Sequence, residues 1–221
     1  MNTSFLFSLN TIQLKWIACF FMLLDHIGAL LFPQEIIFRM LGRVTFPIFA
    51  FMTANACIHT KNIRRYLLRL AIFSLAYEPV FHYCMGGKIN IFATIFLGAL
   101  AIHLYTLLLK NSSLKFLAFL PLALFCIAAE LLPIQYGAYG IVLIFFFYIF
   151  SGRPAGLVLS SLCCCFLYLY LNWPSTLQFY SLLAVPLILL YNGKRGKGSK
   201  WIFYIFYCLH IPLLYLIALL L

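Results

Sequence analysis

Acidic side chains are scarce in this sequence: Asp and Glu together number 4 among 221 residues, and all charged residues make up 9%. A water-soluble domain has about 25% charged residues, so this scarcity excludes an ordinary soluble protein. Apolar residues make up 66% of the chain, and a lipid bilayer can cover that much apolar surface where water cannot. The composition therefore predicts an integral membrane protein.

Several motifs of known chemistry are also missing. The 8 cysteines include no CxxC pair with partner ligands, so we expect no metal site and interpret the cysteines as small buried hydrophobes. The segment NGKRGKGSK lacks the GxxxxGK[ST] spacing of a phosphate loop, and no Ser-His-Asp elbow is present. The first apolar run is too long for the core of a signal peptide and lacks a small-x-small cleavage site, so we expect it to remain as a helix.

Breaks at charged residues, Pro and Gly divide the chain into about nine apolar runs near the ~20 residues that a membrane-spanning helix needs. These runs cover residues 14–32, 40–60, 67–84, 91–109, 115–132, 138–151, 155–172, 176–191 and 201–221. The predicted fold is therefore all-α: a polytopic bundle of about nine transmembrane helices that forms a single domain over residues 1–221.

Basic residues collect in every second gap between these runs. The second, fourth, sixth and eighth gaps with their margins contain Lys61, Arg64, Arg65, Arg69, Lys110, Lys115, Arg153, Lys194, Arg195, Lys197 and Lys200. Because short cytoplasmic loops are enriched in Lys and Arg, the pattern predicts a cytoplasmic N-terminus and an exported C-terminus. The same pattern accounts for the net charge of +11 without a nucleic-acid partner.

An Asp25-His26 pair lies in the middle of the first run, KWIACFFMLLDHIGALLF. A charge at mid-bilayer depth costs at least ~2.5 kcal/mol even on the gentlest insertion scale, so the pair indicates a functional site. With the predicted orientation and a rise of 1.5 Å per residue, His26, Glu78 and His210 lie at similar depths of about 13–16 Å. We therefore take Asp25, His26, Glu78 and His210 as candidate catalytic residues, with scattered hydrogen bonds between helices as the plainer alternative.

A histidine near carboxylates at this depth can act as a general base, a nucleophile or a proton-transfer group. Asp25 and His26 lie about 100° apart on a helix and need not bond each other. We expect His26 to face the bundle interior, with Asp25 or Glu78 orienting an imidazole or a substrate amine. A group-transfer enzyme, a proton-coupled transporter and a passive scaffold are all open. No matching internal repeat supports the transporter, and a scaffold leaves the mid-depth carboxylates unexplained.

The sequence resembles the TraX family in segments that follow in the family's order. These are LDHIG, LGRVTFPIFAF, HTKNIRRYLLRLAIFSLAYEP, INIFATIFLG and IFYIFYCLHIPLLYL. The resemblance covers most of the chain and is strongest over residues 14–105 and 200–216. It implies a multi-pass protein of the bacterial cytoplasmic (inner) membrane, of the kind associated with N-terminal acetylation of F-type conjugative pilin.

The chain is more distantly similar to transmembrane acyltransferases such as the acyltransferase family three enzymes and heparan-alpha-glucosaminide N-acetyltransferase. In the former, an Arg and a His separated by ten residues in the first helix are a hallmark, and Lys15 and His26 have that spacing here. The sequence departs from the TraX pattern at Asn55 and Ala56, where an acidic residue followed by Gly is common, and at His82, where an Asp is expected. These departures concern the acceptor, which can differ from pilin.

The resemblance thus implies an acetyl-CoA-dependent N- or O-acetyltransferase, with a proton-coupled small-molecule transporter as the alternative. The residues expected to hold acetyl-CoA from the cytoplasmic face are Lys15, Arg64, Arg65, Arg69, Lys194 and Arg195. The expected acceptor contacts are Arg43, Asn55 and Tyr136, although Arg43 can equally snorkel to the interface. His26 would deprotonate the acceptor or carry the acetyl group itself. The expected partners are acetyl-CoA, a peptide, pilin or glycan acceptor, and the lipid bilayer.

Overall fold

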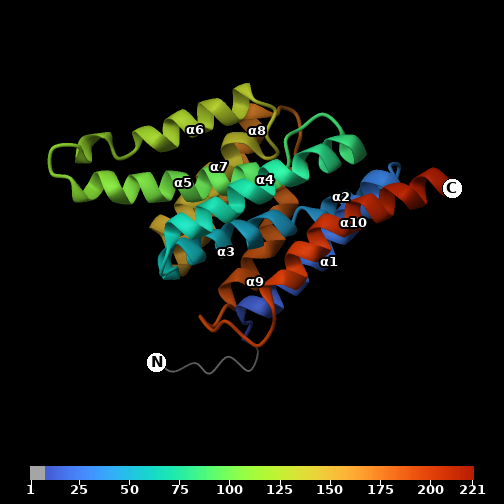
Figure 1. The fold of residues 1–221 in the computed structure, drawn as a ribbon, viewed down its shortest axis with the longest axis horizontal. Coiled ribbons are helices and arrows are strands. Elements are labelled where there is room, and N and C mark those ends of the chain that lie inside the picture. The colour runs from blue at the N-terminus through green and yellow to red at the C-terminus, as the bar shows by residue number, and fades with distance from the viewer. Residues whose placement is uncertain (1–7) are drawn as a thin grey trace. The chain divides into compact units, whose positions relative to one another are not determined.

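The computed structural model describes residues 8–221, apart from the side chain of Lys200, and shows a helical protein (Figure 1). The helices are α1 Thr11–Leu30, α2 Ile36–Gly42, α3 Thr45–His59, α4 Ile63–Met85, α5 Ile91–Lys110, α6 Leu120–Leu131, α7 Gly137–Ile149, α8 Pro154–Leu171, α9 Ala184–Leu189 and α10 Lys200–Leu220. Two 3₁₀ turns, η1 Lys115–Leu117 and η2 Leu177–Leu183, precede α6 and α9. No strand lies within residues 8–221, which confirms the predicted all-α class.

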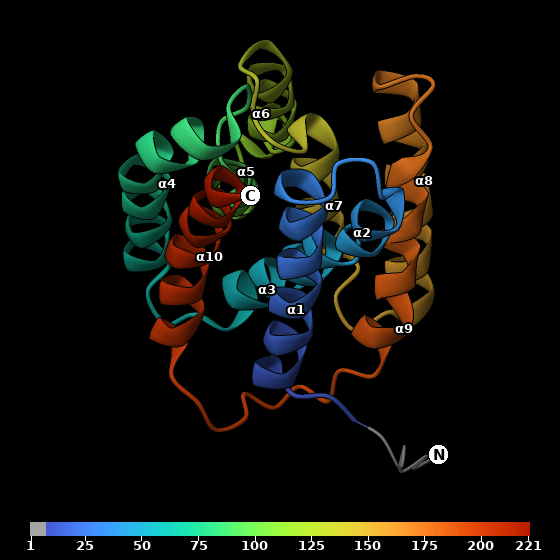
Figure 2. The same ribbon diagram turned by 90° about the vertical axis from the view of Figure 1, so that its right-hand side faces the viewer.

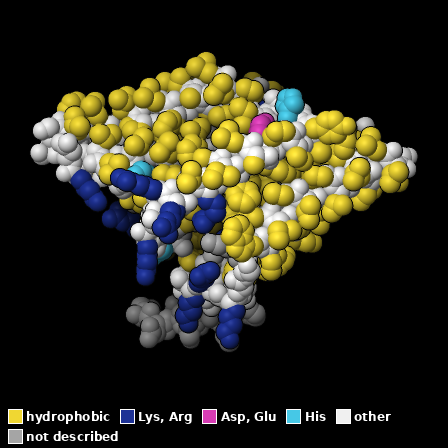
Figure 3. Space-filling view, viewed as in Figure 1, with side chains coloured by type: hydrophobic (Ala, Val, Ile, Leu, Met, Phe, Trp, Pro, Cys, Tyr) yellow, Lys and Arg dark blue, Asp and Glu magenta, His cyan; other side chains and the backbone are white. Residues whose placement is uncertain are grey.

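Five helical stretches of the described chain are long and apolar enough to cross a membrane. They are Thr11–Leu30, Ile36–His59, Ile91–Lys110, Pro154–Leu171 and Trp201–Leu220. Large hydrophobic side chains such as Leu75, Phe116 and Leu131 are exposed, and Figure 3 shows hydrophobic side chains over most of the face drawn. Such a surface suits lipid, so the multi-pass helical membrane protein expected from composition is confirmed. The cytoplasmic position of the N-terminus stays a prediction.

Each of the nine expected runs contains a helix, and most breaks at charged residues, Pro and Gly coincide with connections between helices. The exception is the gap expected at residues 33–39, which contains most of α2. The run expected over 40–60 therefore includes the end of α2, the turn at residues 43–44 and α3. The runs differ in how well they qualify as spans. Helix α4 is long, but its sequence carries three arginines and a glutamate, and helices α6, α7 and α9 are shorter than a full span.

The chain forms two compact units. The first contains the chain up to Phe49 together with Leu169–Leu221, and the second contains Ala50–Tyr168. Helices α3 and α8 continue from one unit into the other. The single domain expected over residues 1–221 stays a prediction.

In the first unit, α1 packs against both α2 and α10, and Figure 2 shows α1 and α10 running side by side. The segment between α9 and α10 returns to the start of α1. There, the N–H groups of Thr11 and Ile12 donate to the carbonyl oxygens of Lys194 (2.9 Å) and Arg195 (3.3 Å). Consequently α1 and α10 begin at the same end of this unit, as expected if residues 192–200 and the N-terminus share one side of the membrane.

Helix α1 buries one row of its side chains. Asn10 and Gln13 form a capping box that satisfies the first turn: the Gln13 N–H donates to Asn10 Oδ1 (3.0 Å), and the Asn10 N–H donates to Gln13 Oε1 (2.9 Å). From Leu14 onward, every fourth residue of the helix is buried: Leu14, Ala18, Met22 and His26. Side chains four residues apart lie along the same face of a helix, so this apolar row ends in His26.

Two glycines allow α1 and α2 to approach closely. A Cβ atom at Gly28 would overlap the side chain of Phe38, and one at Gly42 would overlap the carboxyl group of Asp25. Small residues permit this kind of backbone approach between membrane helices. At the start of α3, Thr45 adds a hydrogen bond from its hydroxyl to the Ala18 carbonyl oxygen (3.3 Å).

In the second unit, α5 contacts α4, α6 and α7. The absence of a side chain at Gly98 lets α5 pack closely against Ile144 of α7, because a Cβ there would lie 2.7 Å from an Ile144 methyl carbon. Nearby, the Tyr105 and Phe145 rings meet edge to face with centroids 5.0 Å apart. These contacts make α5 the central helix of this unit.

Candidate functional site

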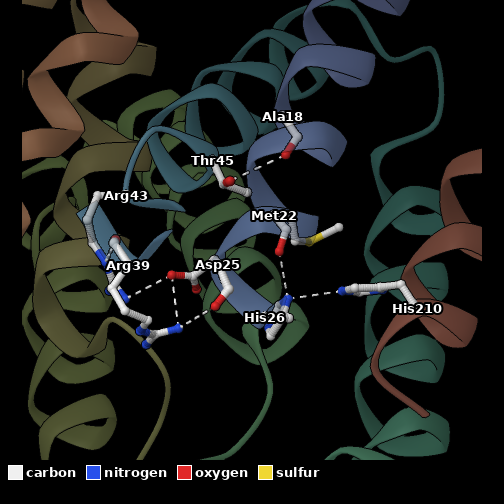
Figure 4. A network of polar contacts seen from close by, with 8 residues as sticks. All are labelled: Ala18, Met22, Asp25, His26, Arg39, Arg43, Thr45 and His210. Carbon is white, nitrogen blue, oxygen red and sulfur yellow. Dashed lines mark hydrogen bonds and ion pairs between the residues drawn. The ribbon is translucent and has the colours of Figure 1, made fainter. Parts of the chain in front are cut away.

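Two buried histidines meet in the first unit. Nδ1 of His26 on α1 lies 3.1 Å from Nε2 of His210 on α10 (Figure 4). The ring planes are inclined at 63°, and the two residues are only 8% and 5% exposed. Both residues lie in helices that are long and apolar enough to cross a membrane. The structure therefore brings together the two histidines that sequence analysis placed at a similar depth.

Each imidazole is also held by its own helix. Nδ1 of His26 lies 2.9 Å from the Met22 carbonyl oxygen, and Nδ1 of His210 lies 2.9 Å from the Phe206 carbonyl oxygen. The Phe206 ring stacks on His210 with a centroid distance of 4.9 Å and an angle of 3° between the planes. Contacts of this kind restrict the rotation of both rings, so the pair is a preorganised arrangement.

Asp25 points to the other neighbour of α1 and forms an ion-pair cluster with α2 (Figure 4). Its Oδ1 lies 2.9 Å from Arg39 Nη1 and 3.3 Å from Arg43 Nη2. Arg39 Nη1 also donates to the Asp25 backbone carbonyl (3.0 Å), and Arg43 Nε donates to the Arg39 carbonyl (3.2 Å). We call Asp25, Arg39 and Arg43 the carboxylate clamp, because two guanidinium groups hold one carboxylate between α1 and α2.

The clamp shows which partners Asp25 has within the described residues. Sequence analysis expected Asp25 or Glu78 to orient an imidazole or a substrate amine, and the structure gives His26 a histidine as its side-chain partner and gives Asp25 two arginines. The physical reason is the angle of about 100° between adjacent helical residues, which turns Asp25 toward α2 while His26 faces α10. The contact of Asp25 with a substrate amine and its catalytic role stay predictions. Arg43, expected as an acceptor contact, is part of this clamp, and its role toward an acceptor stays a prediction.

Glu78 belongs to the second unit and binds the start of α5. Its Oε2 accepts hydrogen bonds from the Asn90 backbone N–H (2.9 Å) and from Asn90 Nδ2 (2.6 Å). Asn90 Nδ2 also donates to the Ser74 carbonyl (2.8 Å), while Asn90 Oδ1 caps α5 by accepting from the Phe92 N–H (2.9 Å). Glu78 thus fixes the connection between α4 and α5, and its expected catalytic role stays a prediction.

The basic residues expected to hold acetyl-CoA lie in both units. In the first, Lys194 and Arg195 are exposed beside the start of α1, and Lys15 extends its ammonium group over the Phe203 ring (5.3 Å to the centroid). In the second, Arg64 and Arg65 are exposed in the first turn of α4.

Arg69, one turn further along α4, lies over the Tyr66 ring at 5.5 Å. Cations in the first turn of a helix oppose its dipole, so Arg64 and Arg65 do not stabilise α4 through this interaction.

The other two expected acceptor contacts, Asn55 and Tyr136, lie in the second unit. Asn55 is partly buried in α3. Tyr136 precedes α7 with φ 63°, a left-handed conformation that is uncommon for a residue other than glycine. Next to it, Glu130 accepts a hydrogen bond from the Ala138 N–H (2.6 Å) and so caps α7.

Sequence analysis missed Arg39 as a member of the site, although a signal for it was present. Arg39 and Arg43 are four residues apart, a spacing that places two side chains on the same face of a helix. Asp25, in the preceding apolar run, was the acidic partner available to that face. Within residues 8–221, no group of three or more His, Cys, Asp or Glu side chains is arranged to hold a metal ion.

Comparison with known proteins places this geometry in a family context. The family model described as "TraX protein" matches residues 10–218, a range that includes the histidine pair and the carboxylate clamp. The probable fimbrial assembly protein FimC, serogroup H1, of Dichelobacter nodosus is 28% identical over 234 aligned residues, which cover 93% of this chain and 94% of that protein. No solved structure matches significantly.

Proposed function

The chain belongs to the TraX family, and from this premise we propose that it is a membrane-embedded acetyltransferase. It transfers an acetyl group from cytoplasmic acetyl-CoA to an amine or hydroxyl of an acceptor at the membrane or its exported side. The N-terminus of a pilin or another peptide is the favoured acceptor, because the similar D. nodosus protein is described as a probable fimbrial assembly protein. The proposed location is the bacterial cytoplasmic membrane.

The observation that carries the proposal is the buried contact between His26 and His210. Ionisable side chains inside a membrane are costly, and those that persist line pathways or reaction sites. Hydrogen bonds to backbone carbonyls alone could satisfy each histidine separately, yet the two rings also meet each other. An imidazole held in one orientation within an apolar site is suited to general-base catalysis.

The chemistry requires one group that accepts a proton. The acceptor nitrogen or oxygen attacks the carbonyl carbon of the thioester, a new C–N or C–O bond forms, and the C–S bond of acetyl-CoA breaks. His26 takes the proton from the acceptor and returns it to the leaving CoA thiolate, so charge and protons balance. In the two-step variant, the imidazole itself attacks the thioester and then passes the acetyl group to the acceptor.

The ends of the first unit suit a donor that enters from the cytoplasm. Lys194 and Arg195 are exposed beside the start of α1, where they can attract the phosphates of CoA. Lys15 lies one turn into the helix, and His26 follows 11 residues later, or about 16 Å at 1.5 Å per residue. The extended pantetheine arm would bridge that distance. Arg64, Arg65 and Arg69 are further candidates for the phosphates.

The carboxylate clamp supports the site indirectly. Because Asp25 binds α2 while the next residue, His26, binds α10, the clamp fixes the rotation of α1 about its axis. Any rotation that broke the clamp would also turn the imidazole away from His210. Asp25 therefore acts in this proposal as a positioning residue.

The test is acetyl transfer by purified protein in lipid nanodiscs. The protein is incubated with acetyl-CoA carrying a labelled acetyl group and a synthetic peptide with a free N-terminal amine and a pilin-like sequence. Mass spectrometry then follows the peptide, and a thiol reagent follows CoA release. Acetylated peptide that forms with the wild-type protein and does not form without protein supports the proposal. Proton-coupled uptake into proteoliposomes without any acetyl transfer would replace it with the transporter alternative.

A further inference from the structure

The ring nitrogens of the histidine pair face partners whose hydrogen-bonding roles are fixed. A carbonyl oxygen can only accept a hydrogen bond, so a ring nitrogen that bonds to it must carry the proton. Nδ1 of His210 faces the Phe206 carbonyl oxygen at 2.9 Å. Nδ1 of His210 is therefore the protonated nitrogen, and in a neutral imidazole Nε2 then carries the lone pair.

The same reasoning assigns His26. Its Nδ1 faces the Met22 carbonyl oxygen at 2.9 Å and the lone pair of His210 Nε2 at 3.1 Å. Both partners are acceptors, so Nδ1 of His26 is the donor and shares its proton between them. The remaining ring nitrogen of His26, Nε2, then carries a lone pair, and no hydrogen bond to it is present within the described chain.

The reverse arrangement fails on the same distances. If His210 donated from Nε2, it would carry protons on both nitrogens and be a cation. Nδ1 of His26 would then be an acceptor and would direct its lone pair at the Met22 carbonyl oxygen only 2.9 Å away. Two lone pairs at that distance repel, and the buried charge would lack a counter-ion in contact, because the carboxylate of Asp25 is bound to arginines.

We propose that His210 and the Met22 carbonyl hold His26 in its Nδ1–H tautomer, so that Nε2 of His26 is the atom that takes the acceptor proton. The last step of this inference rests on the proposed function, whereas the tautomer does not. His210 is then a positioning residue that acts through His26. In hydrolases with a catalytic triad, a carboxylate orients the histidine, and its loss leaves the wrong tautomer. Here a neutral imidazole does so, which avoids placing a further charge within the membrane.

Two substitutions at one position separate tautomer control from packing. The terminal amide of Gln can reach the place of the His210 Nε2 atom and present an oxygen to the Nδ1–H of His26. The shorter Asn places its amide near the former Nδ1, where it can still bond to the Phe206 carbonyl but leaves His26 without its partner. His210→Gln and His210→Asn therefore differ mainly in whether residue 210 can accept a hydrogen bond from Nδ1 of His26. His103→Gln and His103→Asn on α5 are the matched controls.

The direct readout is ¹⁵N NMR of protein in nanodiscs with ¹⁵N-labelled histidine, in which the two ring nitrogens show whether each is protonated. The His26 signals are assigned by their loss in His26→Ala. We expect wild-type and His210→Gln to show His26 protonated at Nδ1. His210→Asn keeps only the Met22 carbonyl as a partner of that nitrogen, so it should show a smaller share of the Nδ1–H tautomer. A wild-type His26 protonated at Nε2 would overturn the inference, whether or not the protein transfers acetyl groups.

The kinetic readout applies once acetyl transfer is established. Loss of an oriented general base costs about 10²–10⁴-fold, so His210→Asn should lower the rate of acetyl transfer by about 10²-fold or more. The apparent KM for acetyl-CoA should stay within a few-fold of wild type, and His210→Gln should restore most of the rate. Equal rates for His210→Asn and His210→Gln would overturn the positioning role. Failure of acetyl transfer in every protein, with the expected NMR result, would refute the proposed function and leave the tautomer supported.

Discussion

Neutralising Asp25 should destabilise the protein by leaving two guanidinium groups beside an uncharged amide. The side chains of Asp25 and Arg43 are 14% and 11% exposed, whereas that of Arg39 is 32% exposed. Removing one partner of a buried ion pair costs about 3–5 kcal/mol, and water reaching Arg39 reduces the penalty on that side. We therefore expect Asp25→Asn to lower the free energy of unfolding by about 2–4 kcal/mol.

A double-mutant cycle tests whether the clamp is the cause. Arg43→Met keeps a long side chain and removes the charge, while Arg39 still pairs with Asp25. In Asp25→Asn/Arg43→Met, the more buried of the two guanidinium groups that lose the carboxylate is gone, so the double variant should be more stable than the sum of the single effects predicts. Contacting charged residues typically couple by about 0.5–3 kcal/mol, and we expect at least ~1 kcal/mol here.

The assay is reversible unfolding in mixed micelles followed by tryptophan fluorescence, since Trp16 packs against Phe203 in the same unit. Far-UV circular dichroism of each variant checks that the helical fold is retained. Strictly additive effects of Asp25→Asn and Arg43→Met, or an Asp25→Asn protein as stable as wild type, would refute the claim that these residues form one buried network.

Three further changes probe the other assignments. His26→Ala should abolish acetyl transfer while the protein stays folded and still binds CoA, and turnover at the wild-type rate would refute the proposed mechanism. A residual rate about 10²–10⁴-fold below wild type would favour direct transfer over a mechanism through an acetyl-histidine. Replacing Arg64, Arg65 and Arg69 together by Gln should raise the apparent Kd for acetyl-CoA, and added salt should do the same because it screens exposed charge interactions. If neither change altered the Kd, these residues would have a role in membrane topology only. Glu78→Ala should destabilise the protein by about 1–3 kcal/mol by leaving buried donors of the α5 cap unsatisfied, and Glu78→Gln, which keeps an acceptor oxygen, should cost less in the same unfolding assay.

Most helices were predictable from the sequence because their limits are set by local chemistry, whereas α2 was not predicted as a separate helix. Charged residues, Pro and Gly interrupt the apolar runs, and the connections between helices fall at those interruptions. Depth was partly predictable for a similar reason, since a helix advances by a fixed rise per residue. His26 and His210 could therefore be matched by counting from the ends of their helices, and the structure places them in contact.

The direction in which each side chain points from its helix axis was harder to predict, because the partners on that side depend on which helices become neighbours. Asp25 was grouped with His26 by depth, yet it binds α2, and nothing local in the sequence shows that α2 turns back against α1 after residue 35. Glu78 illustrates the same limit. Its position along α4 was counted, but its bond to Asn90 depends on how the chain reverses between α4 and α5.

The histidine pair also imposes an order in time, because its members come from α1 and α10, the first and last helices of residues 8–221. They are 184 residues apart in sequence. At about 5–20 residues per second, a ribosome needs roughly 10–40 s to synthesise the chain between them. During that interval, His26 is already made and its partner does not exist. A nascent chain therefore cannot form the pair until α10 has been made, and a product truncated before α10 would lack the contact between the two histidines.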